Sequence, residues 1–307
     1  MKRKVVQQGP ATLMVSLPSK WVKENNVKKG DEVDIEEHKE GLTFRKLGVK
    51  KETKKIELTV KISYPKTIIT LIRNLYINAY DEICLHFKEE KDILAVNEIV
   101  NYLIGYEIIE QNKERCIIRD IATENPEEYD ILFRKVWLTI KTMGDVMIDS
   151  LKEGSIDLPY LKLKDINLNN SKFSCYCRRI LFKHNMTNTS KGLANYIIIN
   201  LIHMIGRNFF YITEYVKENK FKVKKETIDF AKKIIAEFSQ LYNLYYQPEK
   251  VSSDITRKLA DDLIKEAYNM MERDHTKNSG ILYRLAEISR IVATTIPKIE
   301  TVQGFEK

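Results

Sequence analysis

The first 47 residues alternate between short apolar runs and turn signals, a pattern that excludes a long helix at the start of the chain. Gly9-Pro10 and Gly30-Asp31 are turn dipeptides, and Glu40-Gly41 lies at the centre of a predicted hairpin. Pro18-Ser19 opens a short helix, with Ser19 as its expected N-cap. The predicted order is β-β-α-β-β, over residues 3–8, 11–17, 20–25, 32–37 and 42–46.

The same segment concentrates positive charge. Residues 1–30 hold seven Lys and Arg side chains against a single carboxylate, Glu24, whereas the whole chain has a formal net charge of +8. A local basic cluster on a folded domain is expected of a surface that binds a polyanion. The alternative is that a basic N-terminus only aids solubility, and charge alone does not separate the two interpretations.

Several spaced features of this segment resemble the SpoVT/AbrB-type swapped-hairpin domain. They are the basic start Lys2 to Val6, the turn residue Gly9, the stretch Leu13 to Trp21, and the Lys-Gly-Asp turn within Val27 to Val33. The resemblance covers residues 1 to about 47. It implies a dimer that binds DNA, in a family that also includes antitoxins and pure dimerisation modules.

Elementary physics supports a dimer, because 47 residues in four short strands cannot bury enough apolar surface alone. Two interleaved copies would share a core and cover their sheet edges. The resemblance implies that basic side chains of the first strand and the short helix face DNA, and the matching positions are Arg3, Lys4, Lys20 and Lys23. A two-fold axis would place two such sets side by side on a duplex.

The first turn departs from the family pattern. Many members carry an arginine directly after the turn glycine, whereas Pro10-Ala11-Thr12 follows Gly9 here, and Gln7 and Gln8 are the candidate base-reading side chains that remain. The sequence therefore predicts phosphate contacts and salt-sensitive affinity. It leaves open whether the domain reads a DNA sequence, and whether it binds DNA or only dimerises.

Residues 51–122 are predicted as a small α/β domain that follows a charged connector, Lys50 to Lys55. Ile56 to Ile62 alternates as a strand, Pro65 to Ala79 is a helix, and Gly105 is expected as a left-handed helix cap. The order is β-α-β-α-β-β. Its remaining elements are expected over residues 82–87, 93–103, 106–111 and 115–120.

From Pro126 onward, apolar residues recur at the three- and four-residue spacing of amphipathic helices. Helices are predicted over 126–153, 171–186, 190–219, 225–246, 251–273 and 277–297, with breaks at Gly154-Ser155, Asn167 to Asn170 and Gln247-Pro248. Their layout suggests a six-helix bundle of two three-helix repeats that divide near residues 221–225. The fold class is therefore α+β multidomain, with domains at 1–50, 51–122 and 123–300.

This combination of domains resembles archaeal PhoU-like proteins fused to an AbrB domain, and Gly105 to Gln111 with Arg119 to Ile121 resemble their middle region. The resemblance implies phosphate signalling, with phosphate transporters and sensor kinases as partners. PhoU proteins often bind metal through carboxylates at i and i+4, which share one helix face. In the matching stretches Arg207 and Ile291 replace the second carboxylate. We therefore expect no metal, and no other cofactor.

Other polar and aromatic groups have ordinary structural interpretations. His203 is expected as a hydrogen-bonded bundle histidine. The acidic residues Asp145, Asp149, Asp261, Asp262 and Glu266 are expected on solvated helix faces. The tyrosines Tyr242, Tyr245 and Tyr246 are expected to pack or to contact a subunit, with a ligand cage as the alternative.

The cysteines and the hydropathy point to a cytoplasmic protein. The pair Cys175 and Cys177 lacks a second Cys or His pair at zinc spacing, so these two residues, Cys84 and Cys116 are expected as reduced thiols, with a metal or redox role as the alternative. No stretch reaches the roughly 18–20 uncharged apolar residues that cross a bilayer, and no apolar run follows the basic start as in a signal peptide. We expect no membrane insertion.

The sequence contains no Walker A, G-x-G-x-x-G, H-E-x-x-H or G-x-S-x-G motif, so an enzyme is not expected. The leading hypothesis is a homodimeric transcription regulator with a PhoU-like sensor or partner domain, in phosphate-related regulation. The alternative is a phosphate-signalling adaptor that binds a transporter or kinase and uses the N-terminal domain only to dimerise. A metal-dependent enzyme or metal store is disfavoured by Arg207 and Ile291.

Overall fold

The computed structural model describes residues 2–38, 41–46, 53–61, 63–122, 125–152 and 156–304. The chain forms two compact units, Met1–Thr53 and Lys54–Lys307. The first unit is rich in β-structure. The second unit contains both the α/β elements and the helical region, so these two parts belong to one compact body.

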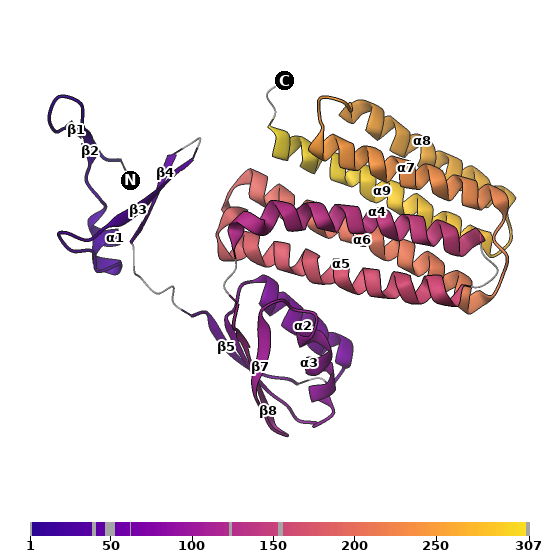
Figure 1. Ribbon diagram of the computed structural model, residues 1–307, viewed down its shortest axis with the longest axis horizontal. Helices are drawn as coiled ribbons and strands as arrows, with labels where there is room; N and C mark the ends of the chain where they lie inside the picture. Colours follow the sequence, from indigo (N-terminus) through magenta and orange to yellow (C-terminus); the bar gives the residue numbers. More distant parts are fainter. Residues whose placement is uncertain are drawn as a thin grey trace. The chain divides into compact units, whose positions relative to one another are not determined.

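The N-terminal unit consists of two β-hairpins joined through a short helix (Figure 1). β1 (Val5–Gln7) pairs antiparallel with β2 (Leu13–Val15), α1 (Ser19–Glu24) follows, and β3 (Val33–His38) pairs antiparallel with β4 (Gly41–Lys46). The two hairpins are separate two-stranded sheets. The predicted β-β-α-β-β order is confirmed. Residue 40 of the predicted Glu40-Gly41 turn lies outside the described residues.

The N-cap prediction for α1 is wrong. Ser19 is the first helical residue, and Pro18 occupies the capping position with extended backbone angles, φ −61° and ψ 128°. Proline has its φ fixed near this value, so it forms the entry to the helix, but it offers no oxygen side chain to the first N–H groups.

In the second unit, residues 55–120 form a four-stranded sheet with two helices on one face (Figure 1). Its strands lie in the order β5 (Lys55–Thr59), β6 (Glu82–His86), β8 (Arg115–Asp120) and β7 (Tyr106–Gln111). β5 and β6 are parallel, and the other neighbours are antiparallel. α2 (Pro65–Ile77) connects β5 to β6, and α3 (Asp92–Val100) precedes β7. Ile83, Leu85 and Ile118 are fully buried, and on β6 Ile83 and Leu85 alternate with Glu82, Cys84 and His86 on the opposite face.

Six long helices follow a short 3-10 turn at Pro126–Glu128, and a second such turn lies at Met186–Asn188. The helices are α4 (Tyr129–Lys152), α5 (Asp157–Lys183), α6 (Ser190–Asn219), α7 (Lys225–Tyr246), α8 (Ser253–Arg273) and α9 (Asn278–Gln303). α4, α5 and α6 pack on one another, as do α7, α8 and α9, and the two groups meet through α6 with α9 and α4 with α7. The helices lie side by side along their lengths in Figure 1.

The predicted break at Asn167 to Asn170 is wrong, because α5 begins at Asp157 and runs through this polar stretch. Asn170 is fully buried, and its amide Nδ2 donates a hydrogen bond to the Val136 carbonyl oxygen at 3.0 Å. A polar side chain with a buried partner can lie inside a helix at an interface. α9 also extends beyond the predicted end at residue 297 and contains Pro297. The predicted Gly154-Ser155 break lies outside the described residues.

A buried arginine on α5 joins the helices to the α/β part. Arg179 has no exposed surface, and its guanidinium donates hydrogen bonds to the carbonyl oxygens of Tyr76 (2.6 Å) and Tyr80 (3.0 Å). It also pairs with the Asp120 carboxylate at 2.5 Å. Lys183 pairs with the same carboxylate at 2.7 Å. These contacts fix α5 to the end of the sheet.

Candidate nucleic-acid interface

The first hairpin presents apolar side chains on both of its faces. Val5 pairs with Val15, and Val6 pairs with Met14. Adjacent residues of a strand point to opposite faces, so the Val5–Val15 pair and the Val6–Met14 pair lie on opposite sides of the hairpin. Val6 is 59% exposed and Leu13 is 71% exposed. This hairpin is therefore a two-sided apolar ribbon with no cover on either side within the described residues.

The second hairpin has one apolar face. Ile35 pairs with Phe44 across β3 and β4. Val33 and Phe44 are partly covered, whereas Ile35 and Leu42 are more than half exposed. Among the residues of this unit whose exposure the structure describes, none is buried. The described part of the N-terminal unit thus has no core of its own in a single chain.

The four predicted DNA-contacting residues are all exposed or partly exposed. Arg3 and Lys4 lie just before β1, although the sequence predicts that the first strand includes them. Lys20 and Lys23 lie on α1, three residues apart and therefore on one side of this helix. Lys20 lies 3.8 Å from Glu24, and both side chains of this pair are highly exposed. No described carboxylate pairs with Arg3, Lys4 or Lys23. These three cations are available to a polyanion.

Two glycine turns shape the unit. Gly9 has φ +82° in the turn after β1, and the Gln8 amide donates to the Thr12 carbonyl oxygen at 2.8 Å. Gly30 has φ +96°, beside Asp31, whose carboxylate accepts from the Lys28 amide at 2.8 Å. Both glycines occupy left-handed conformations that suit a residue without a Cβ. The Lys-Gly-Asp turn is therefore built by its own backbone and Asp31.

In the helical stretches where Arg207 and Ile291 replace the second carboxylate, the neighbouring polar residues have ordinary structural contacts. His203 lies between Asn170, with Nδ1 3.0 Å from Oδ1, and Ser171. Burial, reinforced by the nearby charges of Arg178 and Arg207, lowers the pKa of His203 to about 3, so the imidazole is neutral. Glu287 pairs with Arg290 on its own helix. These contacts match a hydrogen-bonded bundle histidine.

The tyrosines at the end of α7 pack against α4. The rings of Tyr242, Tyr245 and Tyr246 lie 5.8–6.5 Å from the Trp137 ring. The Tyr245 hydroxyl donates to Asn195 Oδ1 at 2.9 Å. These contacts give the patch a packing role within the chain. The predicted acidic residues Asp145, Asp149, Asp261 and Asp262 are exposed, and Glu266 pairs with Lys233 at 2.7 Å.

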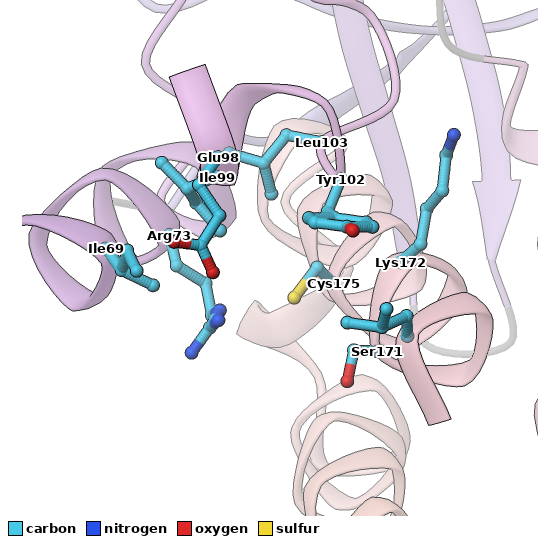
Figure 2. A pocket seen from close by; sticks show the side chains of 10 residues that line it. Ile69, Arg73, Glu98, Ile99, Tyr102, Leu103, Ser171, Lys172 and Cys175 are labelled. Carbon is cyan, nitrogen blue, oxygen red and sulfur yellow. The ribbon is translucent and has the colours of Figure 1, made fainter. Parts of the chain in front are cut away.

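A small pocket lies where α2 and α3 meet α5 (Figure 2). Its lining includes the cations Arg73 and Lys172 and the anion Glu98. In Figure 2 the Lys172 side chain points away from Arg73, so the two cations do not converge. The pocket therefore defines no class of ligand.

One polar cluster in the α/β part goes beyond the sequence predictions. Glu57, Cys84 and His86 lie together on the open face of the sheet. The sequence does carry a signal for it, because a Cys-x-His spacing on a strand places both side chains on one face. The sequence predictions about metal rest on carboxylate spacings in helices and on cysteine pairs. A Cys-x-His spacing on a strand belongs to neither pattern.

None of the described helices is both long enough and apolar enough to span a membrane. No curated protein matches the chain, and no solved structure matches it. Residues 6–52 match the family model of antidote-toxin recognition MazE, bacterial antitoxin, which covers about 15% of the chain. The matched segment spans α1 and both hairpins almost completely. The N-terminal segment is therefore similar to a MazE/AbrB-type domain, which indicates a DNA-binding or antitoxin-type regulator.

Proposed function

We propose that the protein is a homodimeric DNA-binding transcription regulator, in which the N-terminal units of two chains form one DNA-binding domain. This proposal rests on one observation. The strands of the N-terminal unit are apolar, and none of its residues whose exposure the structure describes is buried. The match of residues 6–52 to a MazE-type family supports the same conclusion independently.

The dimer follows from the apolar surface. Val5, Val6, Leu13, Met14 and Val15 are all at least 45% exposed in the single chain. Burying one such side chain stabilises a fold by about 1.5–3 kcal/mol. A second copy that interleaves its hairpins covers both faces of the first ribbon, and it also pairs the exposed strand edges.

The positive charge of the N-terminal unit supports DNA as the ligand. Arg3, Lys4 and Lys23 are exposed and have no carboxylate partner in the described part of the chain. Each of them can replace a counterion on a phosphate. The two-fold axis of a dimer doubles the set and matches the approximate two-fold symmetry of a duplex. Arg3, Lys4, Lys20 and Lys23 are the residues proposed to contact the backbone.

A titration of duplex DNA at several salt concentrations tests this function. We expect binding by the full chain to weaken steeply as salt rises. Lys4→Glu and Lys20→Glu should each weaken binding and should each lower the salt slope by about two per dimer, one contact per chain. Lys164→Glu, on the exposed surface of α5, is the matched control and should bind as the wild type does. Wild-type protein that shows no salt-dependent binding would refute the proposal.

Sedimentation equilibrium tests the dimer separately. The wild type is expected at twice the chain mass, and a Val6→Asp, Met14→Asp double variant at the single mass, because the charges would enter the shared core. Leu94 on α3 is 72% exposed outside this unit, so Leu94→Asp should leave the dimer intact. A double variant that remains dimeric would place the interface elsewhere.

The helical region is proposed as the sensor or partner domain, with no catalytic function. Two packed groups of three helices support the PhoU-like interpretation and, through it, a phosphate-related role. The second candidate function is an adaptor for a phosphate transporter or kinase, in which the N-terminal units only dimerise. A protein that is dimeric in sedimentation but never binds DNA would favour the adaptor.

A further inference from the structure

Three side chains with different metal-binding atoms meet on the open face of the four-stranded sheet. Glu57 comes from β5, and Cys84 and His86 come from β6. Glu57 is the direct cross-strand neighbour of Cys84, and Cys84 and His86 are two residues apart, so strand geometry alone places all three on one face. Their ligand atoms lie within 4.8 Å of one another.

The triangle of ligand atoms has nearly the size that one tetrahedral ion requires. Cys84 Sγ lies 3.7 Å from His86 Nε2 and 3.8 Å from Glu57 Oε1. For zinc bonded to sulfur at about 2.3 Å and to nitrogen or oxygen at about 2.0 Å, the tetrahedral edges to sulfur are about 3.5 Å. The 2.6 Å contact between His86 Nε2 and Glu57 Oε1 is now a hydrogen bond. It would open by less than about 1 Å around an ion.

The charges around the cluster balance a divalent cation. A Cys84 thiolate and the Glu57 carboxylate together neutralise two positive charges. Arg115 is a neighbouring cation, and its Nε donates a hydrogen bond to Cys84 Sγ at 3.3 Å. Its own charge is paired with Glu110 at 3.3 Å. An N–H donor on a metal-bound thiolate is the outer support that metal ligands commonly have.

A catalytic triad does not fit the same atoms. In a Cys-His-acid triad the imidazole uses one nitrogen for the thiol and the other for the carboxylate. Here both Cys84 and Glu57 approach His86 Nε2. Because His86 Nε2 contacts both Cys84 and Glu57, this arrangement suits one ion bound by all three side chains. It does not suit a proton relay, which needs both imidazole nitrogens.

We propose that Glu57, Cys84 and His86 bind one divalent transition-metal ion of the Zn²⁺ type, with water in the fourth position. The mixed sulfur, nitrogen and oxygen set favours such an ion over Mg²⁺ or Ca²⁺, which prefer oxygen ligands alone. The site is independent of the proposed function, because it lies in the second unit, outside the segment proposed to bind DNA.

Metal titration of the full chain tests the site. Tag-free protein is stripped with a chelator and titrated with Zn²⁺ against a chromogenic competitor, and separately with Co²⁺. We expect one ion per chain and, with Co²⁺, the near-ultraviolet charge-transfer absorption of a cobalt–thiolate bond. Cys84→Ser should abolish this absorption and weaken Zn²⁺ binding at least about 100-fold, and His86→Gln should weaken it similarly.

Matched variants separate this site from other thiols and imidazoles. Cys175→Ser changes a buried cysteine of α5, and His275→Gln changes an exposed histidine, and both should bind Zn²⁺ as the wild type does. Circular dichroism confirms that each variant is folded. Wild type with no bound Zn²⁺, or Zn²⁺ binding that survives Cys84→Ser at wild-type affinity, would overturn the proposal. The DNA titration is unaffected by either outcome.

Discussion

At the scale of single residues, the helical region encloses polar groups whose protonation is set by burial. Glu237 on α7 is fully buried, and its Oε2 accepts a hydrogen bond from the Ser289 hydroxyl at 2.7 Å. Its Oε1 has no partner among the described residues. Burial raises the pKa of Glu237 to about 7, so the folded state favours the neutral acid.

Glu237 therefore makes stability depend on pH. In the unfolded chain the carboxyl ionises near the ordinary glutamate pKa of 4.5, whereas in the folded chain its pKa lies near 7. The free energy of unfolding should fall as pH rises through this window, by up to about 3 kcal/mol. Glu237→Gln removes the ionisation. The difference in the free energy of unfolding between this variant and wild type, measured by urea unfolding, should be about 2–3 kcal/mol more in favour of the variant at pH 8 than at pH 4.

The exposed Glu98 on α3 provides the control for this prediction, because Glu98→Gln should produce no comparable pH dependence. An offset between wild type and Glu237→Gln that is the same at pH 4 and pH 8 would show that folding does not raise the pKa of Glu237.

Arg179 gives a second prediction at this scale. Removing one partner of a buried ion pair leaves an unpaired charge and costs about 3–5 kcal/mol. Arg179→Met should destabilise the protein by about 3 kcal/mol, the lower end of this range, measured by urea unfolding, because Asp120 keeps Lys183 as a partner while the carbonyl oxygens of Tyr76 and Tyr80 lose their donor. Arg119→Met breaks a partly exposed pair with Glu82, which keeps Lys55 as a second partner, and should cost at most about 1 kcal/mol. Equal losses would contradict a special role for the buried arginine.

At the scale of elements, local signals predict some boundaries residue for residue and misplace others. The helices predicted over 190–219 and 225–246 match α6 and α7. The hairpin expected over residues 106–111 and 115–120 matches β7 and β8 residue for residue, because alternation and a turn define it locally. The sequence predicts a helix start at residue 171 for α5, because the run of asparagines before it resembles a loop. What keeps Asn170 helical is its contact with Val136 and His203 on other helices, and no local pattern contains that information.

The turn before β7 supplies a prediction for an element boundary. Gly105 has φ +87°, and a Cβ there would lie 2.8 Å from both the Ala122 Cβ and Asp120 Oδ1. Gly105→Ala combines backbone strain with overpacking, each worth about 1–3 kcal/mol. Gly304 has a similar φ of +82° at the end of α9, with nothing within 4 Å of the added atom. Gly304→Ala therefore has the backbone cost alone, about 1–3 kcal/mol, and should be less destabilising than Gly105→Ala in thermal unfolding. A similar cost at both positions would contradict the steric argument.

At the scale of the whole molecule, the division into two units makes the second unit self-sufficient. Residues 54–307 hold every residue that is buried in the described structure. A chain of residues 54–307 should therefore fold, with the thermal midpoint of that unit in the full protein and with no salt-dependent DNA binding. Calorimetry measures the first and a DNA titration the second. Loss of cooperative unfolding in the shortened chain would show that the first 53 residues contribute to its core.

Only part of the candidate interface could be predicted from the sequence. Arg3, Lys4, Lys20 and Lys23 could be selected from the sequence by charge and resemblance, since each lies at an exposed position. Their mutual arrangement could not be predicted, because in the proposed dimer it depends on a second chain. The Glu57, Cys84 and His86 cluster is the opposite case, because it depends on the pairing of β5 with β6 within one chain.

The absence of a buried residue in the described part of the N-terminal unit has a kinetic consequence. If two chains complete each other's core, the unit folds in a second-order reaction, and its folded population varies with the square of the free chain population. A newly made chain would then fold its second unit at once and its first unit only after an encounter. The timing of DNA binding after synthesis would be set by how often chains meet, before any signal reaches the helices.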